Sequence, residues 1–255
     1  MDGRDFMADL TDKTVLITGG GTGLGAALAR AYADQGASVW VAGRTAATLE
    51  AVAEGNAHIH AVEADVTDET SVAAMFDFAG TPDIVIANAG ASDSAPMART
   101  SAEMWHAMIG VNLTGVFLTF REAAHRMKGR DWGRLIAVAS TAGLKGYPYV
   151  SAYAAAKHGV VGLVKSAALE HARSGLTINA LCPGFLDTEM TERSIANIVE
   201  KTGMSAEDAR GNLERMSPQN RLIQPEEVVR AALWLCGPGS EGVTGQAIAI
   251  AGGEV

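Results

Sequence analysis

Residues 14–25 have the sequence TVLITGGGTGLG, in which a short apolar run leads directly into a glycine-rich turn. An apolar run of this length, bounded by glycines, is typical of a buried strand. The pattern from Leu24 to Gln35 predicts a helix, and Gly36 is the kind of residue expected just after a helix ends. The stretch therefore predicts a strand, a tight turn and a helix in immediate succession.

The glycines of this turn are suited to a bound phosphate. Gly19, Gly23 and Gly25 form the pattern Thr-Gly-x-x-x-Gly-x-Gly, which departs from G-x-G-x-x-G because Leu24 stands where the third glycine would be. Glycine permits positive φ and close backbone approach, and a helix N-terminus offers free N–H groups to a pyrophosphate. A purely structural turn is the alternative, but the strand before it and the helix after it favour binding.

Apolar runs and helical patterns alternate along the rest of the chain, which indicates a parallel sheet covered by helices on both faces. We expect one α/β domain over residues 1–255, of the Rossmann-type doubly wound class with about seven strands, whose ligand binds beyond the carboxyl ends of the strands. The other strands are expected at Ser38–Ala42, His58–Glu63, Asp83–Ala87, Arg134–Ala139, Thr177–Leu181 and Gln246–Ile250, and the other helices at Thr45–Ala53, Glu69–Phe78, Ser101–Met127, Ser151–Arg173 and Pro225–Cys236.

One segment, Phe185–Gln224, departs from this alternation. It is polar, contains three methionines and lies between a predicted strand and a predicted helix. A long insertion at the ligand-binding edge is a candidate lid over the substrate.

Composition excludes several functional classes. The 255 residues carry a formal net charge of −9, which argues against nonspecific binding of nucleic acid. The scattered histidines and the two cysteines, Cys182 and Cys236, lack metal-ligand spacing, so we expect no catalytic metal and two buried thiols. The sequence holds no apolar run long enough for a membrane helix, and its acidic start is unlike a secretory signal. We expect a soluble, cytoplasmic protein.

Tyr153 and Lys157 stand four positions apart in SAYAAAKHGV, an alanine-rich stretch that predicts a helix. Residues with this spacing lie on the same face of a helix, so a phenol and an ammonium are adjacent there. Ser140 follows the predicted strand Arg134–Ala139, and Asn112 lies within the predicted helix Ser101–Met127. The alternative is a packing tyrosine, a solvated lysine, a loop or cap serine and an asparagine that satisfies the backbone.

Seven elements occur in order along the chain: the glycine turn, Asp65-Val66, Asn88-Ala89-Gly90, Asn112, Ser140, Tyr153-x-x-x-Lys157 and Pro183-Gly184. Together they resemble the short-chain dehydrogenase/reductase family over almost the whole chain. The resemblance implies an enzyme that moves hydride between a nicotinamide and a carbonyl compound or alcohol. It also implies that Ser140 and Tyr153 hold the substrate oxygen, that Lys157 binds the nicotinamide ribose, and that Asn112 supports a proton relay.

The resemblance further implies that Asp65 contacts the adenine with Val66 beside it, that Asn88 and Gly90 shape the cofactor cleft, and that Thr188 reaches the carboxamide. Together with the glycine turn and the end of the second strand, this gives the expected cofactor contacts: Gly19, Thr22, Gly23, Leu24, Gly25, Arg44, Thr45, Asp65, Val66, Asn88, Ala89, Gly90, Tyr153, Lys157, Pro183, Gly184 and Thr188.

Two physical expectations concern the chemistry of the site. An ammonium beside a phenol favours the phenolate, so Lys157 should lower the pKa of Tyr153 from about 10 toward a useful range. The second strand ends without an acid that would repel a 2′-phosphate, and Arg44 and Thr45 follow it, which favours NADP(H) over NAD(H). Against this, Thr22 stands where NADP-dependent relatives often have a second basic residue.

The expected substrate-facing segments, Ala91–Pro96, Ala142–Tyr149 and Phe185–Gln224, mix apolar side chains such as Leu144, Phe185 and Met190 with few fixed charges. They predict an apolar carbonyl substrate, and the similarity to bacterial ketoreductases favours a 3-oxoacyl or 3-hydroxyacyl thioester. A bulky free ketone or secondary alcohol is the alternative substrate. Three cations are candidates to meet the phosphate of a coenzyme A or carrier group: Lys145, Arg193 and Arg215.

An alternative of another class is a nicotinamide-sensing module without turnover, but an intact proton donor favours an enzyme. The resemblance implies a homotetramer, and the apolar helices Ser101–Met127 and Ser151–Arg173 are its candidate interface.

Overall fold

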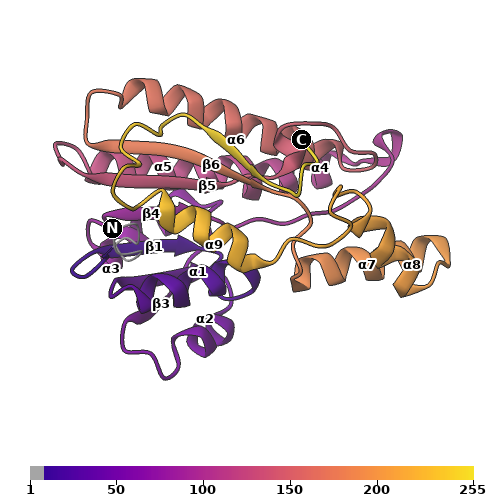
Figure 1. Ribbon diagram of the computed structural model, residues 1–255, viewed down its shortest axis with the longest axis horizontal. Coiled ribbons are helices and arrows are strands. Elements are labelled where there is room, and N and C mark those ends of the chain that lie inside the picture. Colours follow the sequence, from indigo (N-terminus) through magenta and orange to yellow (C-terminus); the bar gives the residue numbers. More distant parts are fainter. Residues whose placement is uncertain (1–8) are drawn as a thin grey trace.

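The computed structural model describes residues 9–255, and seven parallel strands form one sheet at its centre (Figure 1). The strand order is β3-β2-β1-β4-β5-β6-β7. The strands are β1 Thr14–Thr18, β2 Ser38–Gly43, β3 Ile59–Glu63, β4 Ile84–Ala87, β5 Gly133–Val138, β6 Leu176–Pro183 and β7 Ala247–Ile250. The predicted fold class and strand number are confirmed.

The order of the strands locates the ligand-binding edge. The chain builds outward from β1 to β3, returns to place β4 against the other side of β1, and then builds outward to β7. The carboxyl ends of β1 and β4 therefore lie at the switch point of the topology, where a doubly wound sheet opens a crevice for its ligand. The glycine turn follows β1 and the Asn88-Ala89-Gly90 turn follows β4.

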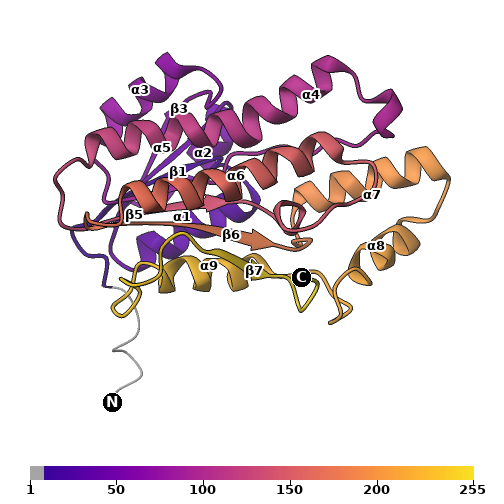
Figure 2. The ribbon, with the colours of Figure 1, turned by 90° about the horizontal axis from the view of Figure 1, so that it is seen from above.

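Helices cover both faces of the sheet (Figure 2). On one face, α1 (Gly23–Asp34), α2 (Ala46–Ala53) and α9 (Pro225–Trp234) pack on apolar side chains such as Val15 and Ile17 of β1. On the other face, α3 (Glu69–Ala79), α5 (Gly115–Arg126) and α6 (Ser151–Glu170) pack on the neighbouring residues, Leu16 among them. This alternation within a strand is the pleat of a sheet buried on both sides.

The helix predicted at Ser101–Met127 is not continuous. The structure divides it into α4 (Ala102–Ile109), a π-helical turn at Gly110–Thr114, and α5. Asn112 lies in the π turn, is fully buried, and bonds through its side-chain amide both to Met108 of α4 and to Ala91 in another loop. A π turn inserted into a helix often marks a functional site. The expectation of one regular helix was wrong. The spacing of apolar residues does not reveal that one extra residue is inserted at Gly110–Thr114.

The segment Phe185–Gln224 contains two helices, α7 (Glu189–Thr202) and α8 (Ala206–Glu214), which project from the carboxyl edge of the sheet (Figure 1). The two helices share a small apolar cluster that includes Ile195 and Leu213. Arg210 of α8 also pairs with Asp187, Glu192 and Glu214 at 2.8, 2.7 and 3.3 Å. The segment is therefore a small packed unit of its own at the edge where the ligand is expected.

Candidate active site

The glycine turn leaves room that any side chain would fill. A Cβ atom at Gly25 would lie 2.1 Å from the carbonyl oxygen of Gly19, and one at Gly19 would lie 2.8 Å from the Cα of Ala89. Gly19 and Gly23 also have positive φ, at 65° and 50°. Thr22 is the N-cap residue of α1 and its side chain makes no capping hydrogen bond. The first N–H groups of α1 are therefore presented at a bare turn, which is the arrangement that binds a pyrophosphate.

The turn after β4 is fastened to the glycine turn. The hydroxyl of Thr18 accepts hydrogen bonds from the backbone N–H groups of Asn88 and Ala89, both at 3.1 Å. The side-chain amide of Asn88 donates to the carbonyl oxygens of Thr18 and Gly19, both at 3.0 Å. These four bonds hold the two walls of the crevice at a fixed separation.

Asn112 joins the π turn to the same wall. Its amide nitrogen donates to the carbonyl oxygens of Ala91 and Met108 at 2.9 and 3.0 Å, and its amide oxygen accepts from the N–H of Ala91 at 3.3 Å. A Cβ at Gly90 would lie 2.8 Å from that oxygen and 3.7 Å from the amine of Lys157. Asn112 thus satisfies the backbone, as the structural interpretation required, and lies next to the candidate catalytic lysine.

Lys157 and Tyr153 lie on α6 where it passes the end of β5. The Lys157 amine is 5.6 Å from the centre of the Tyr153 ring and donates a 2.8 Å hydrogen bond to the carbonyl oxygen of Val138. Lys157 is 3% exposed, so it is not the solvated surface lysine of the alternative interpretation. The amine therefore lies between the carboxyl end of β5, the ring of Tyr153 and the π turn that contains Asn112.

The expected effect of Lys157 on Tyr153 does not hold in this structure. Burial raises the pKa of Tyr153 above its ordinary value, and the hydrogen bond with Ser140 opposes that shift only in part. Burial also lowers the pKa of Lys157 to about 8. The expectation considered the charge of the ammonium but not the loss of water around both groups, which disfavours their charged forms. The phenol is therefore protonated at neutral pH, the form that donates a proton.

Ser140 begins the short loop after β5, and its hydroxyl accepts a 3.1 Å hydrogen bond from the N–H of Ala142. The serine is thus also the cap of the turn at Thr141–Gly143, so the cap and substrate-binding interpretations are compatible. Cys182, on β6, lies buried near Lys157, and burial raises the pKa of its thiol to about 11. Both cysteines are free and buried, as predicted.

The expected adenine-side residues follow β2 and β3. The Asp65 carboxylate accepts hydrogen bonds from the N–H and hydroxyl of Thr67 at 2.9 and 2.7 Å, and these bonds lower its pKa. Val66 is buried against Gly115, the first residue of α5. Arg44 and Thr45 are exposed beyond β2, and the side chain of Arg44 makes no hydrogen bond or ion pair within residues 9–255. Its guanidinium is therefore available at the place where a 2′-phosphate is expected.

The residues after β6 bring the start of the segment Phe185–Gln224 close to the glycine turn. Thr188 is the N-cap residue of α7, and a Cβ at Gly23 would lie 3.5 Å from the Cβ of Thr188. Pro183 ends β6, and Gly184 follows with its N–H bonded to the carbonyl oxygen of Ile250. The candidate lid segment therefore begins beside the candidate pyrophosphate site.

The three expected substrate-facing segments meet one another. Ala95 donates its N–H to the carbonyl oxygen of Tyr149 at 2.8 Å. Asn197 of α7 donates to the hydroxyl of Ser94 at 3.1 Å. The rings of Tyr147 and Phe185 pack edge to face with centroids 6.4 Å apart. The segments thus surround one region at the carboxyl edge of the sheet, close to Ser140.

The cations proposed for a carrier phosphate differ in their surroundings. Lys145 is paired with Glu254, whose carboxylate is 3.1 Å from its amine, and Arg215 donates to the amide oxygen of Asn212 at 2.6 Å. Glu254 could not be identified from the sequence, because it stands in AGGEV without a recognisable motif. Its side chain is 2% exposed.

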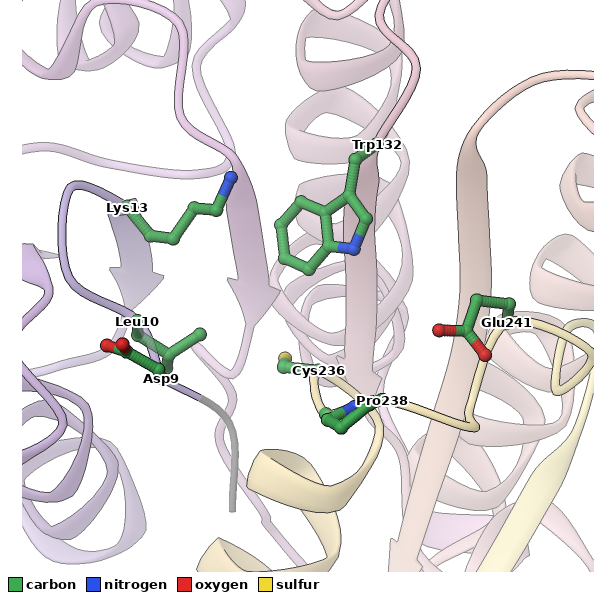
Figure 3. Close-up of a pocket in the computed structure, with 8 residues that line it drawn as sticks. Asp9, Leu10, Lys13, Trp132, Cys236, Pro238 and Glu241 are labelled. Atoms are coloured by element: carbon green, nitrogen blue, oxygen red, sulfur yellow. The ribbon is translucent and has the colours of Figure 1, made fainter. Parts of the chain in front are cut away.

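A pocket of about 250 Å³ lies at the opposite edge of the sheet (Figure 3). Lys13, Trp132 and Cys236 line it near the amino ends of β1 and β5, and none of the candidate catalytic residues does. Over residues 9–255, the structure holds no group of three or more His, Cys, Asp or Glu side chains arranged for a metal ion. In the same part of the chain, every helix is too short or too polar to cross a bilayer.

The sheet order and the strand–turn–helix unit at its switch point are those of a Rossmann-type fold. The chain belongs to the short-chain dehydrogenase family, whose model matches residues 13–198. It therefore acts on CH–OH groups, or on the corresponding carbonyl groups, with NAD(P) as cofactor, and the predicted family and enzyme class are confirmed.

Three similar proteins show how widely substrates vary among relatives. A D-beta-hydroxybutyrate dehydrogenase of Cupriavidus necator is 36% identical, with 96% of this chain and 99% of the relative covered. A 3beta-hydroxysteroid dehydrogenase of Eggerthella lenta is also 36% identical, with coverages of 96% and 94%. The crystal structure of a variant actinorhodin polyketide ketoreductase with NADPH has a TM-score of 0.89 and 32% identity, with coverages of 97% and 98%.

Proposed function

We propose that the protein reduces the ketone of an apolar carbonyl compound to a secondary alcohol, and catalyses the reverse reaction, with NADP(H) preferred over NAD(H). The observation that carries the proposal is the gathering of Ser140, Tyr153, Lys157 and Asn112 at the carboxyl ends of β4 and β5. A sensor of nicotinamide would have no use for a buried proton donor beside a lysine.

When bound, a reduced nicotinamide supplies hydride to the carbonyl carbon. Tyr153 donates its phenolic proton to the carbonyl oxygen, and the Ser140 hydroxyl donates a hydrogen bond to the same oxygen as negative charge develops on it. Lys157 binds the ribose and stabilises the tyrosinate that remains. Asn112 holds the π turn open so that protons reach Lys157 through water.

The cofactor would occupy the crevice between the glycine turn and the lid. Gly19, Gly23 and Gly25 would admit the pyrophosphate to the N-terminus of α1. Arg44 would pair with the 2′-phosphate, because its exposed guanidinium makes no hydrogen bond or salt bridge within residues 9–255 and no acid ends β2. Thr188 would reach the carboxamide.

A 3-oxoacyl or 3-hydroxyacyl thioester is the leading substrate class, supported by the similarity to a polyketide ketoreductase. Bulky ketones and secondary alcohols are the second candidate, supported by the hydroxysteroid dehydrogenase relative and by the apolar side chains Leu144, Phe185 and Met190. The test is a panel of 3-oxoacyl thioesters and bulky ketones with NADPH and NADH, followed at the nicotinamide absorbance band. The proposal fails if no carbonyl compound in the panel is reduced.

We also propose a cytoplasmic homotetramer assembled through α4, α5 and α6. Trp105, Phe117 and Leu169 on these helices are 41%, 42% and 80% exposed, and burying such side chains against a partner stabilises an oligomer. Sedimentation at micromolar concentration tests the assembly, and a monomer would contradict it.

A further inference from the structure

Glu254 stands in an unusual environment for a carboxylate. The residue lies in the segment after β7, and its side chain is only 2% exposed. One of its oxygens is 2.5 Å from the hydroxyl of Tyr147 and 3.1 Å from the amine of Lys145. The other oxygen lies close to Gly184, where a Cβ would be 3.2 Å away. Glutamate is almost never buried without such partners.

The contacts of Tyr147 connect the Glu254 carboxylate to the loop that carries Ser140. The Tyr147 hydroxyl is 2.6 Å from the hydroxyl of Thr141, the residue after Ser140. A phenol has one hydrogen and a carboxylate can only accept, so Tyr147 donates to Glu254 and accepts from Thr141. A chain of two hydrogen bonds therefore runs from Glu254 to the residue beside Ser140.

Glu254 also controls a charge at the edge of the substrate region. The Lys145 amine is paired with the Glu254 side chain and additionally donates to its backbone carbonyl at 3.3 Å. The loop that carries Lys145 and Tyr147 is the substrate-facing segment that meets Phe185 and Ala95. Lys201 of α7 donates a 3.0 Å hydrogen bond to the carbonyl oxygen of Ser94, in another of the expected substrate-facing segments. Because Glu254 pairs with Lys145, the loop at residues 141–149 presents no unpaired cation to the substrate region.

We propose that Glu254 is a positioning and specificity-determining residue: its carboxylate holds the loop after Ser140 through Tyr147 and cancels the charge of Lys145, so that uncharged ketones react in preference to carboxylate anions. The inference rests on the proposed function and adds to it a rule about substrate charge. Removing the carboxylate charge leaves Lys145 as an uncompensated cation, which would attract an anionic substrate.

The test compares ethyl acetoacetate with acetoacetate, which share a ketone and differ in charge. In Glu254→Gln, the ratio of kcat/KM for the ester to that for the anion should fall about tenfold, the size of one charge–charge interaction at a partly exposed site. The double variant Glu254→Gln with Lys145→Met should restore the ratio. Glu241→Gln, a matched change beside the pocket at the opposite edge, should leave it unchanged. An unchanged ratio in Glu254→Gln would overturn the specificity rule.

A second measurement does not depend on turnover. Amide hydrogen exchange in residues 141–149 should be faster in Glu254→Ala than in the unmodified protein, with no change around α1 and α2. Unchanged exchange in that loop would overturn the positioning role. If the unmodified protein reduces neither compound, the proposed function loses support, whereas the exchange measurement still decides whether Glu254 holds the loop.

Discussion

The amine of Lys157 donates a hydrogen bond to the carbonyl oxygen of Val138, 2.8 Å away. This bond ties α6 to the last residue of β5, and Ser140 follows two residues later along the chain. The lysine therefore fixes the position of the helix that carries Tyr153 relative to the loop that carries Ser140. The arrangement keeps an ammonium almost out of contact with water, and this burial has a measurable effect on folding.

Lys157→Met should change the pH dependence of stability. Burial lowers the pKa of Lys157 from 10.5 to about 8, so the folded protein binds this proton less tightly than the unfolded chain. The charged amine thus reduces stability fully below pH 8, and the reduction disappears as pH rises toward 10.5. The free energy of unfolding of the variant, relative to the unmodified protein, should be greatest near neutral pH and decline in alkaline buffer. Urea titrations at several pH values measure it, and a flat difference would contradict the buried charge.

Tyr153→Phe should lower kcat by at least about 100-fold, because the proton donor is lost. Cofactor affinity should be retained, since the phenol oxygen acts on the substrate. Ser140→Ala should also lower kcat while Tyr153 remains, because one hydrogen bond to the developing charge is missing. Steady-state kinetics and a fluorescence titration with NADPH separate the two quantities. Full turnover by Tyr153→Phe would rule out the proposed mechanism.

Arg44→Ala should weaken NADPH binding by about tenfold or more, the size of a lost charge-assisted hydrogen bond, and leave NADH binding nearly unchanged. The matched control is Arg30→Ala, an exposed arginine on α1. If Arg44→Ala weakened the binding of NADPH and NADH equally, or weakened neither, Arg44 would not recognise the 2′-phosphate.

Asn112→Ala should destabilise the protein by about 2–3 kcal/mol, because the carbonyl oxygens of Ala91 and Met108 lose their buried donor. Asn112→Asp should be at least as harmful, since a carboxylate would face the same two oxygens. Chemical denaturation gives both values. Stability equal to that of the unmodified protein would mean that the π turn does not depend on this side chain.

Gly25→Ala should abolish cofactor binding or folding, because the new methyl group would lie 2.1 Å from the carbonyl oxygen of Gly19. Gly162→Ala is the matched control within α6, where a Cβ would meet nothing within 4 Å. Alanine is the better helix former by about 1 kcal/mol, so the control should be slightly more stable. Thermal unfolding with and without NADPH distinguishes the two variants.

The strand–turn–helix unit at residues 14–25 was predictable because its signals are local. An apolar run specifies the strand, and glycines specify the turn wherever a side chain would collide. The grouping of Asn88, Asn112 and Lys157 could be expected only through the resemblance, because these residues are far apart in sequence. The strand order of the sheet brings these three residues together, and the strand order cannot be deduced directly from one sequence.

Other features could not be predicted from the sequence, and the physical reason can be given for each. The direction of the Tyr153 pKa depends on how much water the fold removes, which no local pattern reveals. Glu254 stands among glycines after the last strand, so nothing near it in sequence indicates a buried ion pair with Lys145. The helices α7 and α8 were not predicted, because their polar sequence does not follow the alternation of apolar runs and helical patterns on which the other elements were predicted.

The π turn between α4 and α5 amounts to one residue more than a regular helix would need. Deleting a single residue from Gly110–Thr114 would remove the extra residue and let α4 and α5 merge into one regular helix. Asn112 would then swing away from Ala91, and the wall beside Lys157 would lose its anchor. A one-residue insertion in a helix is thus the feature on which the alignment of the whole crevice depends.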